Sequence, residues 1–343
     1  MVSIIASDLQ PGVRTALSPG AWLEASPRGA YTTARTINHG RSVFELSFHI
    51  HRLATSAKLM LDSDVQEGQS GAEEIRHQYA DALHEEAIRP RIIAALQHAI
   101  TAYYSSGEKL HNNNEVKLTI LISWPNGNNT NSSISNSTML LPTVQTHASA
   151  MGPPPPPPIK VHVRGAPRHN ALAKDSDWVR KRKSYESEMG SDVNEVVLVS
   201  RSGSGTATAT SAAAATAGCI MEGLSSNFFA LIDGKIYTAD EGVLKGSVRE
   251  VVLDVAANQG VEVVLMPPRL SSLMTPSEGW QGAFLTSTSR LLLPIDEMHV
   301  FTDTKHPLVV RVSEDVVGRD VIQRLRDGVM AEIEKKSEPV FTP

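Results

Sequence analysis

Residues with chemically useful side chains follow one another in order through the second half of the chain. They are Lys174, the pair Asn194-Glu195, the segment that begins at Glu222, the helix start at Ser247-Val248 and the hydroxyl pair Ser287-Thr288. A lysine amine can act as a nucleophile, and a carboxylate can raise the pKa of a neighbouring base. The first backbone N–H groups of a helix bind anions such as phosphate. This part of the chain therefore offers a nucleophile, an acid and an anion-binding helix start.

Local patterns predict the elements that would carry this series. A helix is predicted over 247–259, because Ser247 and Glu250 have the spacing of a capping box and Gly260 is a stop signal. The Asp233-Gly234 pair in FFALIDGKIYTA predicts a hairpin with a type I′ turn. Further strands are predicted for NEVVLVS, VEVVLM and GAFLTSTS, and a closing amphipathic helix for residues 319–335.

The first half of the chain also mixes strands and helices. Two strands around a turn at 38–40 are predicted for TTARTINHGRSVFEL, and a buried strand for VKLTILISW. Residues 48–61 have apolar residues at helical spacing with Arg52 off the apolar stripe, and residues 73–104 contain a second long helical pattern. His49 and His51 point to different faces of the first of these helices, so we expect them at the surface rather than as metal ligands. The expected fold class is therefore α/β (α+β), not a helix bundle or a sandwich.

Composition excludes several classes of protein. The chain has 343 residues, a hydrophobic fraction of 41% and a charged fraction of 20%, which are ordinary for a globular protein and exclude a wholly disordered or fibrous chain. The net charge of −5, without a basic cluster, argues against nucleic acid as a partner. No apolar stretch is long enough to span a membrane, and the one cysteine, Cys219, suits a reducing compartment. We expect a cytoplasmic protein, with a plastid or mitochondrial location left open.

Two low-complexity stretches divide the chain. We expect an N-terminal α/β domain over residues 1–145 with a disordered Asn/Ser-rich loop at 126–138, and a Pro-rich linker over 146–158, because polyproline is stiff and extended. A C-terminal domain is expected over residues 159–343, with a low-complexity surface loop at 202–217.

General motif patterns contribute mainly exclusions. The chain has no GxGxxG after a strand, no Walker loop, no GxSxG, no HExxH and no CxxC. These absences argue against the common nucleotide-binding, hydrolase and zinc sites, so no metal site is predicted.

Several short motifs in a fixed order resemble one family. EGLSSNFFALIDGKIYTADEGVLKGSVREVV and LTSTSRLLLPIDEM resemble segments of the class IV, fold-type IV pyridoxal-phosphate enzymes, which include branched-chain and D-amino acid aminotransferases and aminodeoxychorismate lyase. GAYTTARTINHGRSVFELSFHIHRLATSAKLM resembles a stretch from the first half of these enzymes, and its TTAR string is closest to the lyase branch. The resemblance covers roughly residues 28–61 and 170–300.

The resemblance implies a fold, a cofactor and site residues. The implied fold has a smaller N-terminal α/β domain and a larger C-terminal pseudo-barrel domain that binds pyridoxal 5′-phosphate. Lys174 would bond covalently to the cofactor, in preference to the neighbouring Lys160, Lys181 and Lys183, and Glu222 would keep the pyridine nitrogen protonated. Arg52, Ser247, Val248, Ser287 and Thr288 would hold the phosphate, and Tyr31 would line the substrate pocket. The implied assembly is a homodimer that acts on an amino acid and a 2-oxo acid.

Three departures from the family pattern leave the reaction open. Val248 stands where relatives usually have threonine, Lys245 replaces a proline, and Ser123-Trp124-Pro125 stands where many relatives have a T-R-G sequence. We expect amino transfer between an amino acid and a 2-oxo acid. An aminodeoxychorismate lyase-like reaction is the first alternative, and a catalytically silent homologue that acts as a binding protein is the second. The sequence leaves the amino donor and its stereochemistry open.

Overall fold

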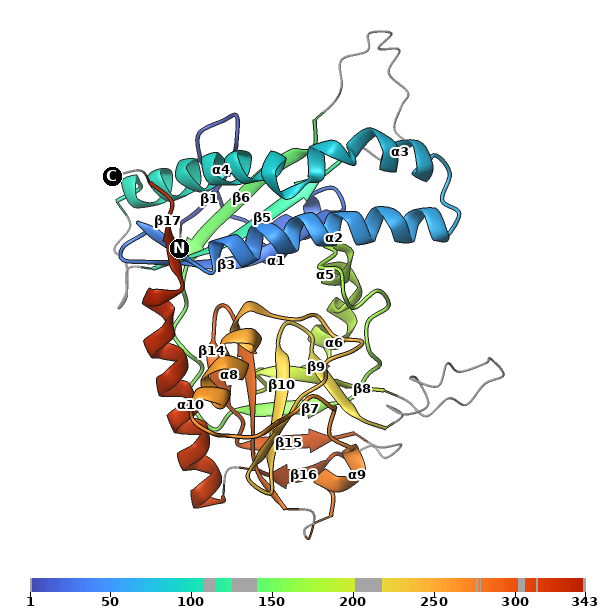
Figure 1. The fold of residues 1–343 in the computed structure, drawn as a ribbon, viewed down its shortest axis with the longest axis vertical. Coiled ribbons are helices and arrows are strands. Elements are labelled where there is room, and N and C mark those ends of the chain that lie inside the picture. The colour runs from blue at the N-terminus through green and yellow to red at the C-terminus, as the bar shows by residue number, and fades with distance from the viewer. Residues whose placement is uncertain are drawn as a thin grey trace. The chain divides into compact units, whose positions relative to one another are not determined.

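The computed structural model describes residues 2–341 apart from 108–114, 125–140, 201–217, 276, 278, 302–305 and 313. The expected loops at 126–138 and 202–217 lie outside the described residues. The chain forms two compact units, shown with their elements in Figure 1. Unit 1 comprises Met1–Gly152, Leu172–Lys181 and Glu334–Pro343, and unit 2 comprises Pro153–Ala171 and Arg182–Ile333.

Each unit combines segments that are distant in sequence. The segment Leu172–Lys181, which contains Lys174, belongs to unit 1 although it follows the Pro-rich stretch. The domain boundaries expected from the sequence, 1–145, 146–158 and 159–343, stay predictions. Residues 146–150 of the expected linker form the end of strand β6, Thr143–Ala150.

The described part of unit 1 is built on one antiparallel sheet with the order β17-β4-β3-β5-β6-β1-β2. Besides β6, its strands are β1 Ser3–Ser7, β2 Val13–Thr15, β3 Gly29–Ile37, β4 Ser42–Phe44, β5 Val116–Ser123 and β17 Ser337–Pro339. Its helices are α1 Pro19–Ala25, α2 Leu46–Gln66, α3 Ala72–Tyr79, η1 Asp81–Leu83, α4 Glu85–Ser105 and α5 Asp177–Lys181.

The core of unit 1 lies between the sheet and the two long helices α2 and α4. Alternate residues of β3 and β5, such as Ala34 and Ile120, pack against apolar residues of α2, such as Ile50 and Leu53. Figure 1 shows α2 and α4 running along the sheet, and both helices contact its strands. The period-two pattern of the strands and the period-3.6 pattern of α2 therefore meet in one core.

Most elements predicted for the first half are confirmed. β3 and β4 flank the turn at 38–40, where Asn38, His39 and Gly40 all have positive φ. The helical pattern over 73–104 is divided into α3, η1 and α4. The break occurs because His84 is extended, with φ −63 and ψ 151, and caps α4.

The described part of unit 2 is built on a mixed parallel and antiparallel sheet with the path β12-β11-β10-β9-β8-β7-β15-β16, while β13 pairs with both β10 and β14. The strands are β7 Lys160–Val163, β8 Glu195–Val199, β9 Ile220–Gly223, β10 Asn227–Ile232, β11 Lys235–Tyr237, β12 Val263–Val264, β13 Trp280–Ser287, β14 Leu291–Pro294, β15 Glu297–Val300 and β16 Leu308–Arg311. The helices are α6 Lys183–Ser187, α8 Ser247–Asn258, α9 Leu270–Leu273 and α10 Val316–Lys335.

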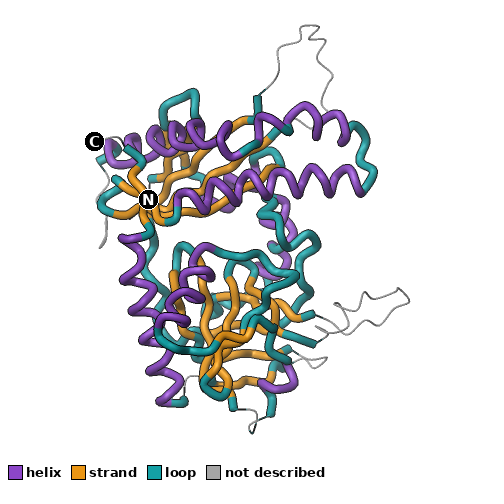
Figure 2. The backbone as a smooth tube through the Cα atoms, viewed as in Figure 1, coloured by secondary structure: helices purple, strands orange, loops and turns teal. Residues whose placement is uncertain are grey.

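The mixed composition of both units confirms the expected α/β (α+β) class, and Figure 2 shows strands and helices in each. The predicted hairpin is present, with Asp233 and Gly234 at φ 49 and 73 between β10 and β11. Among the described helices, none is long and apolar enough to cross a membrane.

The predicted capping box of α8 is wrong. Gly246 is the N-cap residue and Ser247 is the first helical residue, so the Ser247 hydroxyl does not close the helix start. Glu250 accepts a hydrogen bond from Arg249 Nη1 at 2.8 Å. The first turn of α8 therefore begins without a side-chain cap.

Candidate functional site

The backbone of Lys174 is fixed to two elements of unit 1. The Lys174 N–H donates to Ser56 Oγ of α2 at 3.0 Å, and the Lys174 carbonyl accepts from the Tyr31 N–H of β3 at 2.9 Å. The side-chain amine lies 4.8 Å from the centroid of the Tyr31 ring, within the range of a cation–π contact. The structure thus brings together two residues named from the sequence, Lys174 and Tyr31.

The residues after Lys174 pack on the same strand, next to a partly buried ion pair. Asp175 pairs with Ala30 in an antiparallel bridge, and its carboxylate lies 2.8 Å from the Arg28 guanidinium. Arg28 also binds Asp64 of α2 at 2.8 Å. Burial alone would lower the pKa of Arg28, but the two carboxylates raise it. Arg28 therefore stays charged and fastens the segment to β3 and α2.

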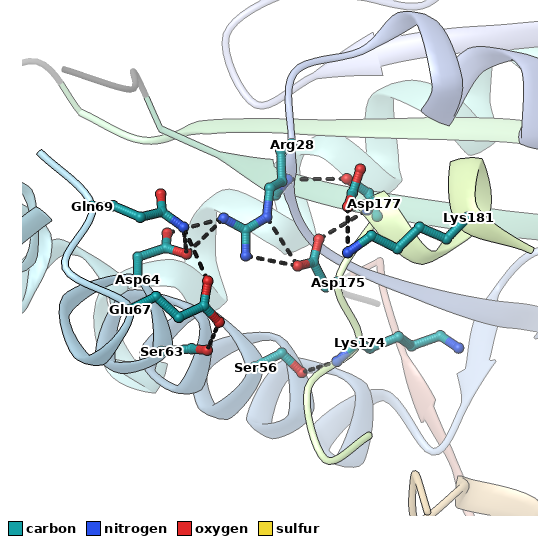
Figure 3. A network of polar contacts seen from close by, with 12 residues as sticks. Arg28, Ser56, Ser63, Asp64, Glu67, Gln69, Lys174, Asp175, Asp177 and Lys181 are labelled. Carbon is teal, nitrogen blue, oxygen red and sulfur yellow. Dashed lines mark hydrogen bonds and ion pairs between the residues drawn. The ribbon is translucent and has the colours of Figure 1, made fainter. Parts of the chain in front are cut away.

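The side chains of Lys174 and Lys181, two lysines of this segment, lie in different surroundings (Figure 3). The Lys174 side chain extends away from the network of Arg28, Asp64 and Asp175, whereas Lys181 turns toward Asp177, 3.0 Å from its carboxylate. The Lys181 side chain is 68% exposed, as expected of a surface residue.

Arg52, the expected phosphate ligand, lies in a buried cluster on α2 and β3. Its Nη2 atom donates to Thr32 Oγ1 and, at 3.1 Å, to His49 Nδ1. His49 is fully buried, so the prediction that it lies at the surface is wrong; one turn from Arg52, it faces β3 instead of solvent. Burial lowers the pKa of His49 well below its usual range, and the charges of Arg52 and Lys174 add to this effect. His49 is therefore neutral, with Nδ1 as the acceptor.

Thr32→Val tests whether this cluster holds Arg52. Valine has the shape of threonine but removes the hydroxyl that accepts from Arg52, so we expect the free energy of unfolding to fall by about 1.5–3 kcal/mol. Urea denaturation followed by circular dichroism measures the change. Thr33→Val is the matched control, because Thr33 points to the opposite face of β3, and there we expect a change within about 0.5 kcal/mol. Equal effects at the two positions would contradict the assignment.

Glu222 is a buried residue of β9 in unit 2, where β9, β10 and β13 pair in register. It pairs with Asn227 of β10, which in turn pairs with Thr286 of β13. The Glu222 residue is only 2% exposed. Its Oε1 atom accepts from Arg168 Nε at 2.9 Å, and its Oε2 atom accepts from the Leu244 N–H at 3.1 Å. Strand pairing therefore holds the Glu222 backbone, and two residues outside the strands, Arg168 and Leu244, fix its carboxylate.

Asn227 connects this carboxylate region to the start of α8. Its amide donates to the Leu244 carbonyl at 2.6 Å, and its Oδ1 atom accepts from the Gly246 N–H at 3.2 Å. A Cβ atom on Gly246 would lie 2.5 Å from Asn227 Oδ1, so the close approach requires glycine.

Two predicted phosphate turns of unit 2 also meet. Ser247 Oγ at the start of α8 lies 3.5 Å from Thr288 Oγ1 in the turn after β13. Ser287 Oγ, in the same turn, accepts from the Arg290 N–H at 3.3 Å. Val248 is buried, which leaves its backbone rather than its side chain as a ligand donor.

Sequence reasoning gave no role to a second buried carboxylate, Glu195. Its Oε2 atom accepts from Arg290 at 2.5 Å, from Ser225 Oγ at 2.8 Å and from Ser226 Oγ at 3.1 Å. Burial raises the pKa of Glu195, but the Arg290 charge and these hydrogen bonds lower it overall. Glu195 is thus an ionised anchor for the turn after β9 and the turn after β13. The NE pair before a strand and the arginine after S-T-S were the visible signals in the sequence.

The structure groups the predicted residues by unit. Lys174, Tyr31 and Arg52 belong to unit 1, and Glu222, Ser247, Val248, Ser287 and Thr288 belong to unit 2. That both sets hold one cofactor stays a prediction. Among the described residues, no group of three or more His, Cys, Asp or Glu side chains has the arrangement of a metal site.

Comparison with protein families gives one match over most of the chain. The family model described as amino-transferase class IV matches residues 29–298. A putative branched-chain-amino-acid aminotransferase from Methanocaldococcus jannaschii is 34% identical over 83 residues, which are 24% of this chain and 27% of that protein. The chain thus matches about a quarter of the length of this curated relative.

Solved structures share the fold at low sequence identity. The branched-chain aminotransferase from Thermoproteus uzoniensis, solved with norvaline, aligns over 99% of this chain and 100% of its own, with a TM-score of 0.60 and 18% identity. A hypothetical aminotransferase from Mycobacterium tuberculosis, in its alpha-ketoglutarate and PMP bound form, aligns over 97% of this chain and 99% of its own, with a TM-score of 0.62 and 16% identity. At these identities the likeness concerns the fold.

Proposed function

The chain belongs to the amino-transferase class IV family, and from that membership we propose that it transfers an amino group between an amino acid and a 2-oxo acid with pyridoxal 5′-phosphate. The observation that carries the proposal is the register of β9, β10 and β13. Asn227 lies between the buried Glu222 on one side and Thr286 on the other, and Thr286 comes directly before Ser287 and Thr288. The Mycobacterium tuberculosis neighbour, described as bound to alpha-ketoglutarate and PMP, supports the same chemistry.

The residues of the chain fit this cofactor. Pyridoxal phosphate, when bound, supplies an electron-withdrawing ring. We assign the covalent attachment and the proton transfer to Lys174, whose backbone is fixed by Ser56 and Tyr31. We assign to Glu222 the role of keeping the ring nitrogen protonated. This residue is 2% exposed, and Arg168 holds its carboxylate.

The phosphate is assigned to donors on three segments, the start of α8, the turn after β13 and helix α2. The uncapped start of α8 offers backbone N–H groups at Ser247 and Val248, which suit a phosphate. The hydroxyl groups of Ser247 and Thr288 lie 3.5 Å apart and would donate together. Arg52 adds a guanidinium group and Ser287 a further hydroxyl group, so the proposed set combines charge with directed donors.

The substrate side of the proposal rests on fewer groups. Tyr31, whose ring contacts the Lys174 amine, is assigned to the substrate pocket. We further propose a homodimer in the cytoplasm, on the family resemblance and on the single cysteine, Cys219, which is buried.

The proposed reaction is tested by adding a panel of L- and D-amino acids to the purified protein loaded with pyridoxal phosphate, with 2-oxoglutarate as acceptor. Glutamate formation, together with conversion of the bound cofactor to its amine form in the visible spectrum, would support amino transfer. Release of pyruvate and p-aminobenzoate from aminodeoxychorismate would support the lyase alternative. The TTAR string at 32–35, which resembles the lyase branch of the family, is the reason to test it. A protein that takes up no cofactor would contradict both reactions and favour the silent homologue.

A further inference from the structure

Arg168 and Glu222 form the most buried ion pair described in unit 2. Their side chains are 7% and 3% exposed, and Arg168 Nη2 lies 2.8 Å from Glu222 Oε1. Arg168 Nε donates to the same oxygen at 2.9 Å. Both contacts fall on one oxygen, while the other oxygen accepts the Leu244 N–H, so the plane of the carboxyl group is fixed from two sides.

Arg168 is itself held in place. Its Nη2 atom also donates to the Ala171 carbonyl at 3.1 Å, which closes the loop of residues 168–171. A planar guanidinium group with three contacts to two acceptors has little freedom to leave the carboxylate. The pair is therefore a fixed part of unit 2 rather than a chance surface contact.

We propose that Arg168 is a positioning residue that keeps Glu222 ionised, so that the proton shared between this acid and the cofactor rests on the ring nitrogen. The proposal rests on the proposed function, because it concerns the cofactor assigned there. It adds a residue that neither the family motifs nor the spacing of the chain singled out.

The direction of the effect follows from distance. A positive charge lowers the proton affinity of any neighbouring group, and the effect falls with separation. Arg168 contacts Glu222 directly, whereas a ring nitrogen hydrogen-bonded to this carboxyl group would lie one group further away. Arg168 therefore weakens proton binding at Glu222 more than at the nitrogen, and the shared proton favours the nitrogen.

Nuclear magnetic resonance of the protein loaded with pyridoxal phosphate labelled with ¹⁵N in the ring measures where the proton rests. In the unaltered protein we expect the resonance of a protonated ring nitrogen. In Arg168→Gln we expect it to move toward the position of unprotonated pyridoxal phosphate, because Glu222 then competes for the proton. Arg168→Lys keeps the charge and should stay near the unaltered protein.

Arg164→Gln is the matched control. Arg164 lies four residues earlier on the same segment and pairs at 2.5 Å with Glu188, whose side chain is 63% exposed. We expect no change of the cofactor resonance in this variant.

The outcomes separate this inference from the proposed function. A ¹⁵N resonance in Arg168→Gln equal to that of the unaltered protein would overturn the inference, because loss of a merely structural arginine changes occupancy but not the proton position. If Arg168→Gln does not fold, Arg168→Lys provides the test. This variant keeps the positive charge, so a ¹⁵N resonance of an unprotonated ring nitrogen in Arg168→Lys would also overturn the inference. An unaltered protein that shows no bound-cofactor resonance would overturn the proposed function instead.

Discussion

Replacing Lys174 by alanine is expected to lower the rate of amino transfer by about 10³-fold or more, because it removes both the covalent attachment of the cofactor and the group that moves the proton. The assay with 2-oxoglutarate measures the rate. A second readout does not need turnover: after treatment of the loaded protein with borohydride, mass spectrometry of the peptides should find the cofactor on the peptide that contains Lys174, and not in Lys174→Ala.

The control for this result comes from the same segment. Lys181 lies seven positions after Lys174 and forms an ion pair with Asp177, with a side chain that is 68% exposed. Lys181→Ala should retain the cofactor on Lys174 and keep the rate within about twofold, because exposed pairs contribute little. Attachment of the cofactor to Lys160, Lys181 or Lys183 in the unaltered protein would reject Lys174 as the attachment site.

Features determined by neighbouring residues were predictable from the sequence. The turn at Asp233-Gly234 needs two residues that tolerate positive φ, and this pair has them at 49 and 73. The helix over 48–61 follows from its apolar stripe, which packs on the sheet as α2. In both cases the signal and the structure involve the same few residues.

Features that depend on distant segments were not predictable. Arg52 lies off the apolar stripe, a position that suits a surface residue, yet it is 9% exposed because Thr32 of β3 and His49 surround it. Arg168 is separated from Glu222 by 54 positions, and no local pattern links them. The segment after Lys174 joins β3 more than 140 residues earlier, through the bridge between Ala30 and Asp175.

The capping box failed for a different reason. Ser247 and Glu250 have the right spacing, but Gly246 takes the N-cap position and Asn227 accepts its N–H. The helix therefore begins at Ser247, but its N-cap residue is Gly246, which Asn227 of β10 contacts. The Ser247 hydroxyl does not cap the helix and lies 3.5 Å from Thr288 Oγ1, in the proposed phosphate site.

The second large effect is expected at Arg290. Arg290→Ala leaves Glu195 buried without its charge partner, and breaking a buried ion pair costs about 3–5 kcal/mol of unfolding free energy. The side chains of Glu195 and Arg290 are 5% and 17% exposed, so water compensates little of this loss. Urea denaturation at neutral pH measures the change. Affinity for pyridoxal phosphate should fall as well, because the Arg290 side chain also donates from Nε to Ser287 Oγ, at 3.4 Å, in the proposed phosphate turn.

The control for Arg290 is an exposed arginine of the same unit. Arg311 lies 3.7 Å from Glu297 with a side chain that is 66% exposed, and Arg311→Ala should change the unfolding free energy by less than about 1 kcal/mol. Similar losses for the two alanine variants would show that burial of the Glu195 pair does not matter.

The dependence of stability on pH gives the same pair an independent signature. The pKa of Glu195 is lowered in the folded protein, because the Arg290 charge and the hydrogen bonds outweigh the effect of burial. The folded state therefore binds this proton less readily than the unfolded state, where glutamate has its ordinary value of 4.5. The stabilisation is complete above that value and is lost as the pH falls through the lowered pKa. Glutamine does not titrate. The free energy of unfolding of Glu195→Gln should therefore be lower than that of the unaltered protein by a constant amount near neutral pH, and this difference should shrink below about pH 4.5. A deficit that stays constant down to acid unfolding would mean that Glu195 is not the ionised anchor of these turns.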